Sequence, residues 1–302
     1  MHQFWEIISK ADNVPIVIML VLVCFFTWLS FREALKYDRA RAEGKTVKQA
    51  VYAEEAGFPE RVAVWPHLVR QEFLVAIGVT IFLMLWSIAL DAPLEELANP
   101  NVTPNPSKAP WYFLGLQELL VYFDPWIAGV MLPNVIVVGL MAIPYIDINP
   151  KGSGYYTLRE RPLAISIFLF GFLFLWVLMV CIGTFARGPG WLWFWPWQHW
   201  DVHRVVAETN IDFSDKFFGV DSASPMGFWI GLAAVALWFP AVMFPPLLLP
   251  SFRRSEFFQR LGIVRYLVFA SLLATMLATP VKMILRIFLH VKYIWVTEWF
   301  NV

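Results

Sequence analysis

The residues most able to do chemistry lie in one short stretch, residues 109–120, which reads APWYFLGLQELL. Trp111 and Tyr112 are aromatic residues with polar tips, and Gln117 and Glu118 follow them about two helical turns later. The stretch lies between two long apolar runs, so we expect it near a membrane surface. An ionisable Glu118 among leucines at that depth is costly unless it has a function or a partner. We therefore take this stretch as the candidate functional element.

A quinol is one ligand that these side chains suit. It is an apolar molecule whose polar head carries two exchangeable protons, so its site needs an apolar cleft, an aromatic wall and a proton acceptor. The chain supplies those types here with Trp111, Tyr112, Gln117, Glu118 and Asp124. In the alternative interpretation, Trp111 and Tyr112 are ordinary interfacial aromatics, and Glu118 is neutral or pairs with Lys108 or a partner's base.

The composition indicates an all-α polytopic membrane protein. Of 302 residues, 59% are hydrophobic and 15% are charged, whereas soluble domains have about 25% charged residues. The 16 tryptophans and 27 phenylalanines fit aromatic belts at the membrane interfaces. The net charge of zero gives no case for nucleic acid or for a polybasic lipid-binding patch.

About 20 mostly apolar residues are needed to cross a bilayer. This length predicts six membrane-spanning helices, at residues 14–31, 74–90, 126–145, 163–185, 228–249 and 264–281. Prolines in or beside the third, fifth and sixth spans predict kinks, which neighbouring helices can accommodate. No internal repeat is evident and the spans are nearly free of charge, which disfavours a transporter.

The basic residues predict the orientation. With both termini outside, the inner segments 32–73, 146–162 and 250–263, together with Arg265, hold fifteen of the 23 lysines and arginines. Residues 109–120 then face the outer, proton-releasing side. The inner loop 32–70 is predicted to be a solvated helix, and the tryptophan-rich outer loop 187–225 an interfacial platform that meets another protein. The tail 282–302 is predicted to lie flat as an interfacial helix.

The histidines do not favour haem held by this chain alone. They are His2, His67, His199, His203 and His290, and none falls in the middle of a predicted span. The sequence also has no Cys-x-x-Cys-His motif for covalent haem. His199 and His203, four residues apart, could share a metal on one helix face. Their prolines and tryptophans favour an irregular loop with interfacial hydrogen bonds instead.

Several motifs in order resemble the C-terminal half of cytochrome b, which is the separate subunit IV of cytochrome bf complexes. They are an inner Trp65-Pro66 start, a span, an Asn-Pro-x-x-Thr-Pro approach at residues 99–104, a Trp-Tyr tetrapeptide at 109–112 and a further span. The resemblance implies domains at residues 1–64 (an added helix and inner loop), 65–185 (the cytochrome b-like core) and 186–302 (the outer loop, two spans and the tail). In that family, the tetrapeptide lines the outer quinol-oxidation site.

One departure from the family pattern matters. The family usually has Pro-Glu-Trp-Tyr, whereas this chain has Ala109-Pro110-Trp111-Tyr112, so Pro110 replaces the glutamate to which proton acceptance is assigned. We hypothesise that Glu118 takes the proton and that Tyr112 helps to hold the quinol head. Such variant tetrapeptides suggest a complex that uses menaquinol.

The resemblance also implies partners and a location. A cytochrome b subunit would hold two haems b, and a Rieske iron–sulfur protein or a multihaem cytochrome c would accept electrons, in a dimeric complex of the bacterial inner membrane. An inner quinone pocket would lie near Trp65, His67 and Arg70, although His67 as an interfacial anchor is the alternative. The rival function is a structural membrane anchor that holds peripheral redox subunits and binds no quinone.

Overall fold

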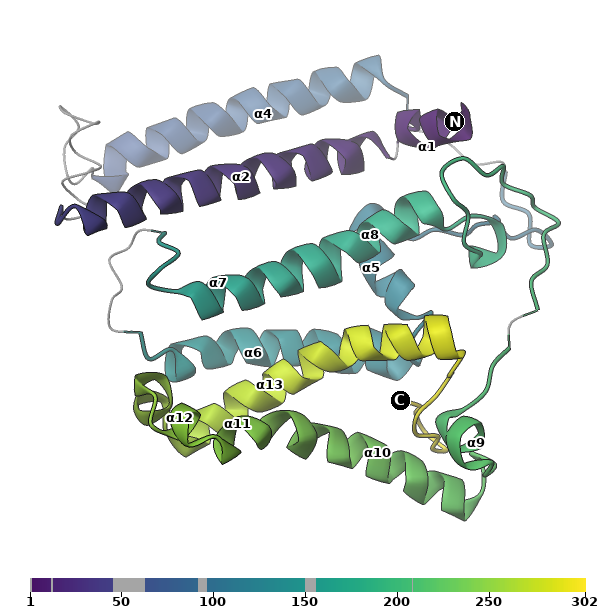
Figure 1. Cartoon of the computed structure of the whole chain (residues 1–302). Helices are drawn as coiled ribbons and strands as arrows, with labels where there is room; N and C mark the ends of the chain where they lie inside the picture. The colour runs from purple at the N-terminus through teal and green to yellow at the C-terminus, as the bar shows by residue number, and fades with distance from the viewer. Residues whose placement is uncertain (1, 12, 46–62, 92–96, 150–155, 208) are drawn as a thin grey trace. The chain divides into compact units, whose positions relative to one another are not determined.

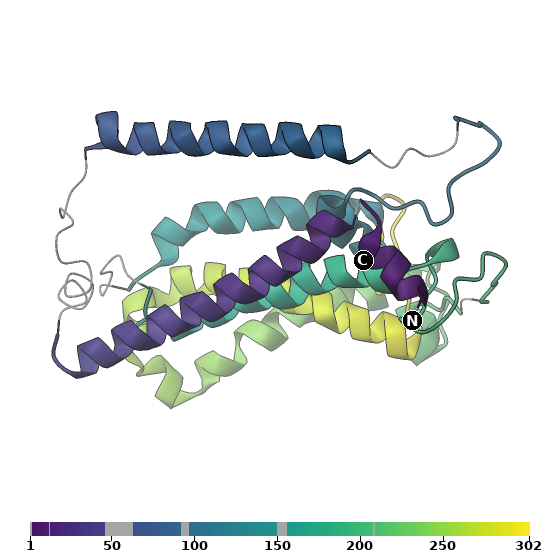
Figure 2. The same ribbon diagram turned by 90° about the horizontal axis from the view of Figure 1, so that it is seen from above.

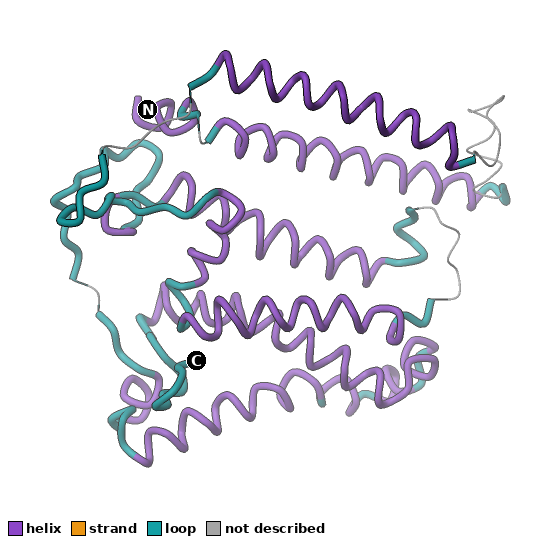
Figure 3. Tube along the Cα trace, turned by 180° about the vertical axis from the view of Figure 1, so that it is seen from behind, coloured by secondary structure: helices purple, strands orange, loops and turns teal. Residues whose placement is uncertain are grey.

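The computed structural model describes residues 2–11, 13–45, 63–91, 97–149, 156–207 and 209–302. Within these residues the chain is helical apart from turns, loops and isolated β-bridges (Figure 1; Figure 3). The six helices that are long and apolar enough to cross a membrane span Val14–Ala42, Val64–Ala89, Ile127–Ile146, Pro162–Ala186, Pro225–Met243 and Glu256–Leu289. The all-α fold with six spans, predicted from the sequence, is confirmed.

Most spans are longer than their apolar runs. The first continues to Ala42, which confirms a helix for the start of the predicted inner loop; residues 46–62 of that loop lie outside the described residues. The fifth is shorter than predicted, because α10 (Pro225–Met243) ends just before Pro245 and Pro246, which begin the short α11 (Pro245–Leu248). The helix α12 (Pro250–Arg253) then leads to α13 (Glu256–Leu289), inside which Gly262 has a positive φ of 71°.

The chain forms two compact units, residues 1–103 with 151–165 and residues 104–150 with 166–302. The first unit contains α1 (His2–Ser9), α2 (Val14–Ala42), the π-helical η1 (Val64–Leu68) and α4 (Val69–Ala89). No residue of α4 is buried within the chain, as expected of a helix that faces lipid or another subunit. The fourth span begins in this unit, in α7 (Pro162–Leu169), and continues in the other.

The second unit holds the candidate site. The fourth span continues there through η3 (Phe170–Val177), α8 (Leu178–Cys181) and η4 (Ile182–Ala186). The short helix α5 (Trp111–Leu119) packs against α8 and η4 (Figure 1). The long helix α13 packs against both α6 (Leu132–Ile146), which continues η2 (Ile127–Met131), and α10 (Figure 2). The loop 187–212 contains one 3-10 turn, η5 (Pro189–Trp191), and ends at α9 (Phe213–Phe218).

The C-terminal tail differs from its prediction. Residues 282–289 are the last turns of α13, and residues 290–302 are not helical, so the predicted interfacial helix over 282–302 is wrong. The helix ends where His290 adopts a left-handed conformation. The tail then folds back: Val291 bridges to Ile211, and the buried Lys282 donates from Nζ to the Lys292 carbonyl oxygen at 2.7 Å.

The tail packs closely on α10 at Gly231. A β-carbon at this glycine would lie 2.6 Å from the Ile294 carbonyl oxygen and 2.8 Å from the Trp295 Cα. We predict that Gly231→Ala displaces the tail and lowers the free energy of unfolding by about 1–3 kcal/mol. Limited proteolysis should then cut the tail faster than in the parent chain. Gly78→Ala is the control, because a β-carbon at Gly78 in α4 meets nothing within 4 Å; equal cleavage of both variants would contradict the prediction.

Candidate functional site

The helix α5 begins at the aromatic residues of the candidate stretch. Pro110 precedes the helix in an extended conformation, and its carbonyl oxygen accepts from the Phe113 backbone N at 2.8 Å. The buried face of α5 consists of Leu114, Gly115, Glu118 and Leu119. Gly115 fits against the fourth span, where a β-carbon would lie 3.4 Å from the ring of Trp176. This close packing fixes the position of α5.

Tyr112 lies on the open side of this helix. The residue is 50% exposed, and its hydroxyl makes no hydrogen bond with the described part of the chain. The rings of Trp111 and Tyr112 meet edge to face with centroids 5.6 Å apart. An aromatic surface with an unengaged hydroxyl is therefore available to a ligand.

Side-chain hydrogen bonds hold the segment before α5, residues 105–110, in place. Gln117 accepts at Oε1 from the Ala109 backbone N and donates from Nε2 to the Ser107 carbonyl oxygen, both at 2.8 Å. Lys108 donates from Nζ to the Thr184 carbonyl oxygen at 2.8 Å. Asn105 Oδ1 accepts from the Gly190 backbone N at 2.6 Å. These contacts hold residues 105–110 against the end of the fourth span, and they give Gln117 a structural role.

Glu118 is fully buried and forms an ion pair with Arg187. The guanidinium donates from Nε to Glu118 Oε2 at 2.9 Å and from Nη2 to Glu118 Oε1 at 2.7 Å. The Tyr122 hydroxyl also donates to Oε1, at 2.8 Å. Arg187 further donates from Nη1 to the Trp191 carbonyl oxygen at 3.1 Å and lies over the Trp193 ring. This two-point pairing joins α5 to the tryptophan-rich loop.

The electrostatics keep both neighbours of Glu118 protonated. Burial raises the pKa of Tyr122 well above its usual value, and the Glu118 carboxylate adds to the effect. Burial alone would lower the pKa of Arg187, but the hydrogen bonds and charge of Glu118 outweigh it and raise that pKa. At neutral pH Glu118 therefore faces one fixed cation and one phenol donor.

The other predicted site residues are less closely grouped. Asp124 lies in the turn after α5; its Oδ1 accepts from the Trp126 backbone N at 3.0 Å and its Oδ2 from Asn301 Nδ2 at 3.5 Å. Trp65, His67 and Arg70 lie in the first unit, at η1 and the start of α4, and are exposed within the chain. The inner pocket thus remains a prediction.

Two residues that bond to Glu118, Tyr122 and Arg187, were not predicted from the sequence as part of the site. Tyr122 could have been found, because it lies four residues after Glu118 and shares its helical face if the helix continues. Arg187 was counted only as an outer charge, because 69 residues separate it from Glu118. The available signal was an arginine directly after an apolar span, on the same predicted side of the membrane as a glutamate among leucines.

His199 and His203 lie in an irregular part of the loop, as predicted. The His203 backbone N bonds to Asp201 Oδ1 at 2.9 Å. Among the described residues, no group of three or more histidines, cysteines, aspartates and glutamates could hold a metal ion.

The six apolar helices define the class: this is an integral membrane protein. Residues 97–195, which contain α5 and the Glu118–Arg187 pair, match the model of the cytochrome b(C-terminal)/b6/petD family. The family suspected from the sequence motifs is thereby confirmed.

Curated relatives share part of the chain. The menaquinol:cytochrome c reductase cytochrome c subunit of Geobacillus thermodenitrificans is 28% identical over 39% of this chain and 47% of its own length. The protein of the same name from Bacillus subtilis (strain 168) is 28% identical over 44% of this chain and 51% of its own length. The chain thus spans about half the length of these relatives. No solved structure matches it.

Proposed function

We propose that this chain is a membrane subunit of a quinol:cytochrome c-type oxidoreductase that oxidises menaquinol. The cytochrome b C-terminal domain at residues 97–195 supports this, and two relatives are named as subunits of a menaquinol:cytochrome c reductase. The chain would be catalytic only within the complex. It would help to form the outer quinol-oxidation site, while neighbouring subunits carry the electrons away.

The observation that carries the proposal is an aromatic pair, with Tyr112 exposed and Trp111 half-buried, at the fixed start of a helix. Trp111 and Tyr112 begin α5, the hydroxyl of Tyr112 is unengaged within the described residues, and the Gln117 contacts hold the approach in place. A quinol ring could lie against these aromatics with its head group near the Tyr112 hydroxyl. Preorganised positioning of this kind is what a shared site between two subunits requires.

Proton transfer by Glu118 would need the Arg187 contact to open. Both carboxylate oxygens accept from Arg187, and Glu118 is fully buried. We propose that Glu118 takes a proton only in such an open state. Asp124 is only partly buried and lies in the turn after α5, so it is a second candidate acceptor.

The remaining assignments follow the family resemblance. We propose a partner cytochrome b subunit that holds haem b, with quinol bound at the shared site and no cofactor held by this chain alone. A Rieske protein or a multihaem cytochrome c would dock at the tryptophan-rich loop, in a dimeric complex of the bacterial inner membrane with both termini outside. The division at residues 64 and 185 and the inner pocket at Trp65, His67 and Arg70 belong to the same proposal.

A structural membrane anchor is the second candidate. The Glu118–Arg187 pair favours it, because a buried ion pair between α5 and the start of the tryptophan-rich loop holds the two together whether or not a quinone binds. An anchor would still hold a redox partner, but the exposed Tyr112 would then contribute nothing to turnover.

The complex purified through a tag on this chain tests the proposal. We expect it to contain a haem b protein and to reduce a c-type cytochrome with menaquinol, whereas this chain, once separated, shows no haem spectrum. Membranes that lack the chain should lose this activity. If the chain purifies without a haem b protein, or if its loss leaves menaquinol oxidation unchanged, the proposal is wrong.

Variants at the buried pair separate proton transfer from structure. We predict that Glu118→Gln slows quinol oxidation, both because it removes a proton acceptor and because it leaves Arg187 buried without an anion. The double variant Glu118→Gln with Arg187→Gln removes both charges. If its turnover stays low while its thermal stability recovers, Glu118 transfers protons; if turnover recovers with stability, the pair is structural only.

A further inference from the structure

The charged end of α2 has two different faces. On one face Ala34 and Asp38 are buried, and the Asp38 carboxylate accepts from the Arg159 backbone N at 3.3 Å. Arg41, one turn further on, pairs with Glu160. This face therefore uses its charges within the first unit of the chain.

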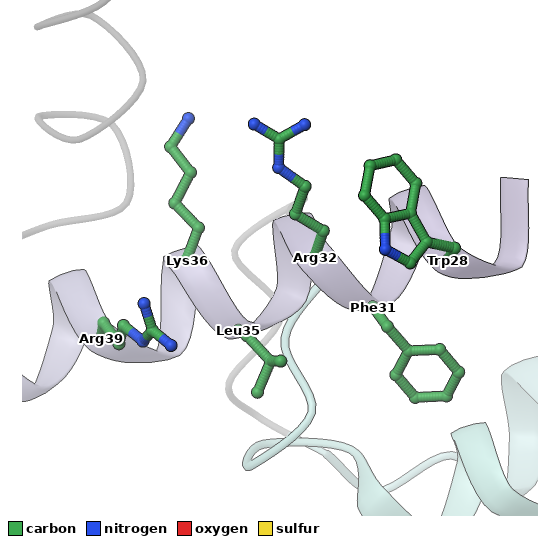
Figure 4. Close-up of a pocket in the computed structure, with 6 residues that line it drawn as sticks. All are labelled: Trp28, Phe31, Arg32, Leu35, Lys36 and Arg39. Atoms are coloured by element: carbon green, nitrogen blue, oxygen red, sulfur yellow. The ribbon is translucent and has the colours of Figure 1, made fainter. Parts of the chain in front are cut away.

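The other face presents cations beside aromatic and apolar side chains. A pocket of about 400 Å³ is lined there by Trp28, Phe31, Arg32, Leu35, Lys36 and Arg39 (Figure 4). The Arg32 guanidinium lies 5.6 Å from the centre of the Trp28 ring, and Lys36 lies 3.7 Å from Glu33. No carboxylate of the described residues lies within 4.0 Å of the Arg32 or Arg39 guanidinium, and both residues are exposed.

The position of this pocket along the helix matches a lipid head group. The apolar run that begins at Val14 ends at Phe31, and Arg32 is the first charged residue after it. Trp28, one turn before Arg32, is an aromatic residue at the level where tryptophans sit in membrane interfaces. The Arg32 guanidinium thus lies at the level where phosphates are found, and Trp28 lies one turn toward the apolar run.

We propose that this face of α2, at Trp28, Arg32, Lys36 and Arg39, binds an anionic phospholipid. Phosphate oxygens would pair with the guanidinium groups of Arg32 and Arg39, and the acyl chains would run along the apolar part of α2. The neutral total charge of the chain gave no hint of such a site, because acidic residues elsewhere cancel cations that cluster here. The proposal stands apart from quinol oxidation, since it rests on a different unit of the chain.

Native mass spectrometry of the detergent-purified full-length chain tests this inference. Phosphatidylglycerol is titrated against phosphatidylcholine with the same acyl chains, and we expect a clear preference for the anionic lipid. Arg32→Gln with Arg39→Gln should weaken phosphatidylglycerol binding by roughly tenfold or more. Arg253→Gln with Arg254→Gln removes two exposed arginines outside the pocket and should leave binding within about twofold of the parent.

A further variant, a stability measurement and a competition with phosphate test for other ligands and for folding defects. The double variant Arg32→Lys with Arg39→Lys keeps both charges and should retain most of the lipid binding. Unchanged thermal stability of the Arg32→Gln, Arg39→Gln variant excludes misfolding as the cause of its weaker binding. Inorganic phosphate at millimolar concentration should not displace the lipid, because it lacks the acyl chains. Three results would each overturn the proposal. They are equal losses of binding in the two Gln pairs, displacement of the lipid by phosphate, and loss of lipid binding in the purified complex, where a partner would cover the face.

Discussion

Replacing Arg187 by methionine is expected to lower the free energy of unfolding by about 3–5 kcal/mol. Methionine has a similar length but no charge, so the fully buried Glu118 carboxylate loses its cation and two hydrogen bonds. Among the residues that the structure describes, only the Tyr122 hydroxyl would still donate to it. Thermal or denaturant unfolding of the detergent-purified chain measures the loss.

A matched double variant shows whether the unpaired charge is the cause. Glu118→Leu with Arg187→Met replaces the whole pair by apolar residues, so the stability should return close to that of the parent chain. Arg204→Met is the control, because it removes an exposed arginine of the same loop without touching Glu118. If Arg187→Met unfolds like the parent, the pair contributes no stability and α5 is held by apolar packing alone.

The second large effect is expected at Tyr112. In the purified complex, Tyr112→Ala should lower kcat/KM for quinol oxidation by about tenfold or more, because it removes both an aromatic contact and a hydroxyl near the quinol head. The stability should change little, since the ring is half exposed and its hydroxyl has no hydrogen bond with described residues. Steady-state kinetics over a range of quinol concentrations measures the effect, and Tyr112→Phe separates the hydroxyl from the ring.

Trp126→Ala provides the comparison for an ordinary interfacial aromatic. Trp126 is 58% exposed and directly precedes η2 at the start of the third span. Its loss should leave kcat/KM within about twofold of the parent value. If the two variants lose activity equally, Tyr112 is also only an interfacial aromatic, and the membrane anchor becomes the better description.

The sequence predicted the helices well because apolar length is a local property. Six apolar runs became six helices, and only their ends moved. The ends depend on features outside the apolar runs: charged turns extend α2 to Ala42, whereas Pro245 limits α10. The tail was mispredicted because its alternation of apolar and basic residues reflects contacts with residues 211–213 and with α10, which are distant in the chain.

The sequence predicted which types of residue form the candidate site, but it did not predict which of them pair with one another. Burial of Glu118 was expected to require a partner, and the partner is Arg187, whose proximity depends on how α5 packs on the fourth span. Gln117 has the right chemistry for a ligand, yet both ends of its amide bond the backbone of residues 107 and 109. Polar side chains near a site cannot be assigned to ligand or scaffold until their backbone neighbours are known.

Pro110 stands where the family pattern that this sequence resembles has a glutamate. Its φ of −52° and ψ of 148° are open to any L-amino acid, and the residue is exposed at the start of α5. A carboxylate there would also lie at the positive end of a helix, which favours it. Replacement of Pro110 by glutamate would therefore add an acid at the start of α5 while the backbone stays as it is.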